Sequence, residues 1–144
     1  MTGKTPTACA LLVAAISKSL AADAVSLLQR MPSSFSGTYV WEHSGETWHA
    51  ALTFTSRYTG ENGDAIFEGT VNIRGQDRVT SFGTRVRAVV NAQTLAFEMA
   101  EINGHSKSGF PPRVYTGKIA PDLNTISART GSSGKNLAVH LTAR

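Results

Sequence analysis

The chain has 144 residues, of which 41% are hydrophobic and 17% charged, and its formal net charge is +4. This length suits one domain with a hydrophobic core, and the composition is typical of a folded protein rather than a disordered one. The Lys and Arg residues are scattered singly and do not alternate with aromatic residues, which argues against nucleic-acid binding. The single cysteine, Cys9, can form no intrachain disulfide and supplies no thiolate cluster for a metal.

Residues 1–24 have the layout of a secretory signal peptide. Lys4 precedes an apolar run from Ala8 to Ile16, and the small residues around Ala24 form a cleavage site of the A-x-A type. The run is too short for a transmembrane anchor, which needs roughly 20 apolar residues. We therefore expect cleavage after Ala24 and a secreted or periplasmic protein.

Apolar residues also recur at helical spacing between Leu12 and Met31. The alternative to a signal peptide is therefore one amphipathic helix packed on the domain. Under either interpretation, residues 25–34 are expected to form a short helical lead-in whose helix ends before Pro32.

The stretch Phe35–Ser56 predicts a β-hairpin with its turn at Ser44-Gly45. A two-residue loop there places Trp41 opposite Trp48 and sorts the apolar residues onto one face. In the same register, Tyr39 pairs with Ala50 and Phe35 with Phe54.

Asn62-Gly63 predicts a second hairpin, because both residues tolerate the positive φ of a type I′ turn. A two-residue loop there pairs Tyr58 with Phe67 and Leu52 with Ile73. Two hairpins with independent turns therefore share one inward surface.

The remaining strands continue this meander through residue 144. The turn at 75–77 pairs Val71 with Phe82, and the turn at 91–94 pairs Ala88 with Phe97. The following strand points Glu101 inward near its end. The last two hairpins pair Ile119 with Ile126 and Ile126 with Val139, while Arg85 and Arg87 point outward.

Eight sequential antiparallel strands predict an all-β domain over residues 35–144, in the form of a closed up-and-down barrel. A two-sheet β-sandwich is the alternative. The pattern aromatic-x-Gly-x-apolar recurs at Gly37, Gly69 and Gly117. Glycine inside a strand is tolerated where a barrel wall bends sharply, so a structural role is the favoured explanation.

The strand number, the meander order and the early Gly37-x-Tyr39-x-Trp41 resemble the calycin-like small barrels, the group of lipocalins, fatty-acid-binding proteins and avidins. The resemblance covers Phe35 to Arg144. Lipocalins usually carry a tighter Gly-x-Trp, whereas here Tyr39 holds that place and Trp41 follows two residues later. No biotin contacts of avidin carry over to this chain. The resemblance implies the fold and suggests a cavity.

One end of the predicted barrel is the candidate ligand-binding site. Alternate turns meet at each end of a meander, so the long Asn103–Pro112 loop joins the Ser44-Gly45 turn there. An eight-stranded barrel can hold one small ligand between apolar walls and a few polar anchors. The candidate ligand-binding residues are Trp41, Trp48, Thr80, Glu101, Phe110 and Tyr115.

Catalytic and metal sites find little support in the sequence. The four histidines are dispersed, so no metal site and no cofactor are predicted. Neither a nucleophile with an oriented base nor a suitable pair of carboxylates is visible.

We therefore expect a non-enzymatic barrel that binds a small apolar or amphipathic ligand. The alternative is a protein-interaction module, such as an inhibitor of a secreted enzyme, that contacts its partner through the 103–112 loop.

Overall fold

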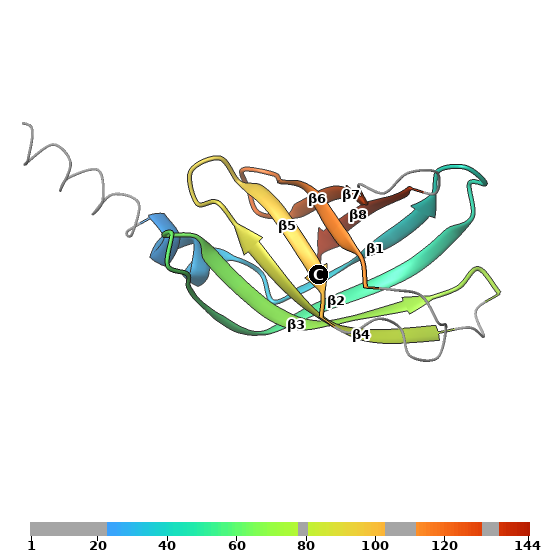
Figure 1. Cartoon of the computed structure of the whole chain (residues 1–144), viewed down its shortest axis with the longest axis horizontal. Coiled ribbons are helices and arrows are strands. Elements are labelled where there is room, and N and C mark those ends of the chain that lie inside the picture. The colour runs from blue at the N-terminus through green and yellow to red at the C-terminus, as the bar shows by residue number, and fades with distance from the viewer. Residues whose placement is uncertain (1–22, 78–80, 103–111, 131–135) are drawn as a thin grey trace, which may run out of the picture.

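The computed structural model describes residues 23–77, 81–102, 112–130 and 136–144. Eight strands form one closed antiparallel barrel, in which β1 also pairs with β8 (Figure 1). The strands are β1 (Ser34–Trp41), β2 (Thr47–Thr59), β3 (Ala65–Arg74), β4 (Ser81–Val90), β5 (Ala96–Glu101), β6 (Val114–Ile119), β7 (Thr125–Thr130) and β8 (Leu137–Ala143). The predicted up-and-down barrel is confirmed, and the fold is not a two-sheet sandwich.

A short helix at residues 23–30 precedes β1 and lies at one end of the barrel (Figure 1). Ala24, Leu27 and Met31 are buried, and the last two belong to the hydrophobic core. The predicted cleavage point after Ala24 falls within this helix, and cleavage there stays a prediction. In the part of the chain that the structure describes, no helix has the length and apolar character needed to cross a membrane.

The two ends of the barrel differ in the elements and side chains that lie there. The helix end holds the helix and the β2–β3, β4–β5 and β6–β7 turns. The tryptophan end holds Trp41 at the end of β1 and Trp48 near the start of β2. Between the two ends, the interior is packed with large side chains. Among the described residues, the largest fully buried side chains are Tyr39, Tyr115, Phe35, Phe67, Leu27 and Leu52.

Most predicted faces are correct, but most predicted pairings are wrong by two residues. Phe35 pairs with Leu52 instead of Phe54, and Tyr39 pairs with Trp48 instead of Ala50. The same displacement occurs in the β3–β4, β4–β5 and β7–β8 pairs. The β1–β2 turn is longer than the predicted two-residue loop, because the Trp41 N–H donates to the Glu46 carbonyl. Side chains alternate with a period of two, so this shift changes the partner and keeps the face.

The β6–β7 register was predicted correctly. Ile119 pairs with Ile126, and Gly117 pairs with Ala128. The turn there contains Pro121, whose fixed φ suits the second position of a β-turn, so its length was readable from the sequence. In this hairpin the proline therefore made the turn length, and with it the register, predictable.

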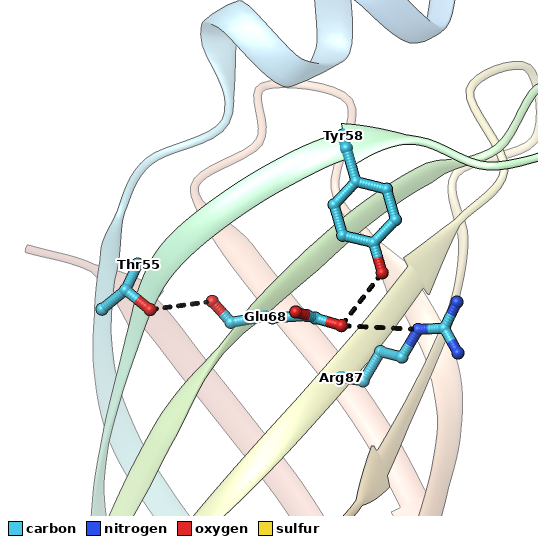
Figure 2. Close-up of polar contacts among 4 residues, drawn as sticks. All are labelled: Thr55, Tyr58, Glu68 and Arg87. Carbon is cyan, nitrogen blue, oxygen red and sulfur yellow. Dashed lines mark hydrogen bonds and ion pairs between the residues drawn. The ribbon is translucent and has the colours of Figure 1, made fainter.

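The β2–β3 pair contains a β-bulge between Phe54 and Ser56. The bulge reverses the face of the residues that follow it, so Arg57 pairs with Phe67 and Tyr58 points outward. The prediction that Tyr58 faces Phe67 is therefore wrong. Tyr58 is 40% exposed, and its hydroxyl donates to Glu68 Oε1 at 2.9 Å on the outer wall (Figure 2).

Three glycines allow close contact between neighbouring strands. A Cβ atom on Gly37, Gly69 or Gly117 would lie only 1.8 to 1.9 Å from a carbonyl oxygen of the adjacent strand. No backbone can yield that far without breaking its ladder, so these positions require glycine. The structural explanation for the aromatic-x-Gly repeat is thus confirmed.

Candidate ligand-binding end of the barrel

Trp48 lies at the mouth of the tryptophan end, between the neighbouring strands β1 and β3. It is half-buried and packs against the core. Its ring stacks on that of Phe82, with centroids 5.3 Å apart and planes 22° apart. Its Nε1 donates to Glu46 Oε1 at 2.9 Å, which fixes the ring orientation. Trp48 therefore presents an aromatic ring of fixed orientation at the rim.

Trp41 is the second aromatic residue of this rim. The Arg113 guanidinium lies over its ring, 5.1 Å from the centroid, and the His43 ring meets it edge-on at 5.8 Å. Trp48 lies opposite Tyr39, so the predicted cross-strand pair of Trp41 and Trp48 is wrong. The two tryptophans contribute separately to the rim, and each has its own polar partner.

Glu101 provides a buried carboxylate at the end of β5, where it is only 4% exposed. Its Oε1 accepts the main-chain N–H of Arg113 at 2.9 Å, and its Oε2 accepts the Tyr115 hydroxyl at 3.1 Å. A buried carboxylate is costly unless hydrogen bonds and an opposite charge compensate it. The inward position predicted for Glu101 is confirmed, and its partners explain how the barrel tolerates it.

Two buried tyrosines stand beside this carboxylate. The Tyr39 and Tyr115 rings meet edge-on, with centroids 5.4 Å apart. Burial is the main cause that raises the pKa of Tyr39, followed by Tyr115 and Glu101. Burial also raises the pKa of Tyr115, helped by Glu101 and opposed by Arg113. Both phenols are therefore neutral near pH 7 and can donate hydrogen bonds.

The Tyr39 hydroxyl is buried without a hydrogen-bond partner among the described residues. The same holds for Asn136 Oδ1, immediately before β8. Leaving a buried polar atom unpaired costs about 1–3 kcal/mol, and such atoms are rare in folded proteins. The tryptophan end therefore holds one hydroxyl donor, that of Tyr39, without an acceptor, next to the hydrogen-bonded Glu101 carboxylate.

The structure brings four of the predicted site residues to one end of the barrel: Trp41, Trp48, Glu101 and Tyr115. Thr80 and Phe110 lie outside the described residues, as do residues 103–111 of the loop that was predicted to contact a partner. Sequence reasoning missed Tyr39 and Arg113 as members of this end. The inward face of Tyr39 was predicted, but the two-residue register error paired it with Ala50 and hid its place beside Trp48.

Besides His43, which contacts Trp41 at the rim, His140 makes a polar contact on the outer wall. Ser127 Oγ and His140 Nδ1 are 3.4 Å apart on exposed faces of β7 and β8. Within the described ranges, no three His, Cys, Asp or Glu side chains gather closely enough to hold a metal ion.

Comparisons with protein-family models, with curated proteins and with solved structures found no match to this chain. The architecture itself, an eight-stranded antiparallel closed barrel, is consistent with the calycin-like small barrels.

Proposed function

We propose that this protein is a secreted or periplasmic barrel of calycin-like type, without catalytic activity, that binds a small apolar or amphipathic ligand at the tryptophan end. The observation that carries the proposal is the buried Glu101 network beside an aromatic rim. Ligand sites in proteins combine apolar walls with a small number of placed polar groups, and this end has both.

The arrangement favours an amphipathic ligand with a neutral, hydrogen-bond-accepting head. The rings of Trp41 and Trp48 offer half-exposed apolar surface to the body of such a ligand. The unpaired hydroxyl of Tyr39 can donate to a carbonyl or ether oxygen. A ligand with a carboxylate head would be repelled by the negative charge of Glu101. Since the hydroxyl is closed to solvent, the ligand reaches it only by displacing side chains at the rim.

Binding is favoured over catalysis because Glu101 is already engaged. A general base must be able to take a proton from its substrate. Here the carboxylate accepts hydrogen bonds from Arg113 and Tyr115, which hold its charge in place. Such a network suits a fixed polar anchor.

Tryptophan fluorescence offers a direct test, because both tryptophans of the chain lie at this end. Titration with fatty alcohols, fatty-acid esters and aromatic ketones should change the emission in a saturable manner. Single Trp41→Phe and Trp48→Phe variants should assign the change to a ring. Unchanged emission across the panel, together with ligand-free protein in native mass spectrometry of material from the source, would refute the proposal.

Tyr39→Phe separates binding from stability. Removal of an unpaired buried hydroxyl should stabilise the free protein by about 1 kcal/mol. The same change should weaken binding of a ketone or ester about fivefold to tenfold, because the donor is gone. Tyr115→Phe is the matched control, since its hydroxyl bonds Glu101 and its loss should destabilise the protein. Equal ligand affinity in Tyr39→Phe and the unmodified protein would exclude Tyr39 as the anchor.

A further inference from the structure

A groove of about 680 Å³ lies on the outer wall of the barrel, across strands β1 to β4. Its position is set by strand alternation, because most lining residues occupy outward-facing positions. The lining includes Ser36, Ala51, Asn72, Gly83, Arg74 and Arg144. The groove is separate from the buried Glu101 network, which lies inside the barrel.

Small residues form the floor of the groove. Ser36 pairs with Ala51, Ala51 with Asn72, and Asn72 with Gly83, so these four form one continuous row across the strands. Three of the four have a small side chain or none. The Asn72 side chain lies over Gly83, since a Cβ there would be 2.8 Å from Asn72 Oδ1. The row is therefore hollow, with one amide group projecting into it.

Basic residues lie on both sides of this row. On the side toward the tryptophan end, His49 pairs with Arg74 and Arg74 with Ser81. On the other side, the main-chain N–H of Arg144 bonds the carbonyl of Ser34, two residues before Ser36. Among the described lining residues there are two arginines and a histidine, and none of these residues is Asp or Glu. Guanidinium groups bind carboxylate and phosphate oxygens with matching geometry.

We propose that this groove binds a small organic anion through a carboxylate or phosphate group. The volume falls within the range of about 300–1,000 Å³ that small-molecule sites occupy. Arg74 and Arg144 neutralise the anion from opposite sides, the Asn72 amide donates a hydrogen bond, and the floor at Ala51 and Gly83 leaves space for the body of the ligand. This inference stands independently of the ligand proposed for the tryptophan end.

Two-dimensional ¹⁵N–¹H NMR of the full chain tests the proposal, because it reports where a weak ligand binds. The probes are phenyl phosphate and citrate, with inorganic phosphate at equal ionic strength. We expect at least one organic probe to cause saturable shifts centred on the amides of Ala51, Asn72 and Gly83, at lower concentration than inorganic phosphate. The two organic probes also distinguish a phosphate from a carboxylate group.

Two variants and a matched control make the test specific. Arg74→Gln should weaken binding about tenfold, the usual loss for a charge-assisted hydrogen bond. Ala51→Leu should fill the floor and weaken binding at least as much, because residue 51 points outward and leucine suits a strand surface. Lys118→Gln removes the same charge from an exposed position on β6 and should leave the affinity unchanged.

The proposal is overturned if the shifts spread over basic residues all around the barrel, or if Lys118→Gln weakens binding as much as Arg74→Gln. It is also overturned if neither organic probe binds more tightly than inorganic phosphate, which would indicate nonspecific attraction to a cationic protein. Saturable binding of poly-glutamate at these amides without binding of the small probes would indicate a peptide site instead. If Ala51→Leu fails to fold, the Arg74 and Lys118 variants still decide the question.

Discussion

At the helix end, Arg57 closes the barrel by binding main-chain carbonyls that the short helix leaves exposed. It donates to the carbonyls of Leu28 and Met31 at 2.6 and 2.8 Å and to Ser33 Oγ at 2.9 Å. Its guanidinium also lies over the Phe67 ring at 5.3 Å. The guanidinium therefore has hydrogen-bond acceptors and an aromatic ring around it, as expected of a group with a structural role.

At the tryptophan end, several polar groups lie close together, but some of them lack a hydrogen-bond partner. Among the described residues, two buried side-chain atoms lack a hydrogen-bond partner, Tyr39 Oη and Asn136 Oδ1, and both belong to this end. Sites that serve function commonly keep such unsatisfied groups, whereas purely structural regions pair them. The contrast indicates that the helix end holds the fold together and the tryptophan end is available for a ligand.

The largest effect is expected from Gly69→Ala, next to the bulge that turns Arg57 into the helix end. Its new Cβ would lie 1.8 Å from the Thr53 carbonyl oxygen, so the β2–β3 ladder must separate. We expect a loss of about 3 kcal/mol or more in the free energy of unfolding, measured by urea denaturation. Gly83→Ala is the control, because its Cβ would meet only side-chain atoms of Asn72 and no backbone atom. Similar losses for both variants would contradict the requirement for glycine in the wall.

Arg57→Met tests the closure of the helix end directly. The thioether fills similar space but cannot donate to the Leu28 and Met31 carbonyls, so we expect a loss of about 3 kcal/mol. Arg57→Lys should recover little of it, because an ammonium lacks the planar fork of the guanidinium.

A matched control for Arg57 lies on the outer wall. Arg87 contacts Glu68 at 3.9 Å in a solvent-exposed pair, as Figure 2 shows. Arg87→Met should therefore change stability by less than about 0.5 kcal/mol. If the Arg57 and Arg87 variants unfold at the same urea concentration, the helix end is not closed by Arg57.

Glu101→Gln probes the polar network of the tryptophan end. The amide keeps the shape of the carboxylate but is uncharged. Its single oxygen cannot accept both the Arg113 main-chain N–H and the Tyr115 hydroxyl as the two carboxylate oxygens do. We expect a loss of about 2 kcal/mol, smaller than for Arg57→Met. Glu98→Gln on the exposed face of β5 is the control and should be neutral. A neutral effect of Glu101→Gln would mean that the buried carboxylate contributes nothing to the stability of this end.

The final prediction concerns alkaline pH. Tyr39 and Tyr115 have raised pKa values in the folded protein, so the unfolded chain releases these protons first as the pH rises above about 10. Stability is therefore fully present below pH 10 and falls above it, by about 1.4 kcal/mol per pH unit for each tyrosine. Urea denaturation between pH 9 and 11 should show this slope, and the double Tyr39→Phe, Tyr115→Phe variant should reduce it. An unchanged slope in the double variant would show that other groups titrate.

Part of the candidate site could be predicted from sequence because its members follow strand alternation. Glu101 and Tyr115 belong to inward positions, and both face the interior as expected. Their hydrogen bond could not be predicted, because it depends on the angle at which β5 meets β6. The unpaired state of the Tyr39 hydroxyl also escapes sequence reasoning, since it depends on every neighbour of one atom.

The sequence by itself determined which face of the barrel most strand residues occupy, together with the order of the strands. This information is local, because a period of two and a chain of short turns settle it. The tertiary structure alone decided which residues meet across strands, where the Phe54–Ser56 bulge turns Arg57 inward, and that Tyr39 lies opposite Trp48. Those outcomes depend on turn lengths and on the fit of side chains around the whole barrel, and a displacement of two residues leaves no trace in the apolar pattern.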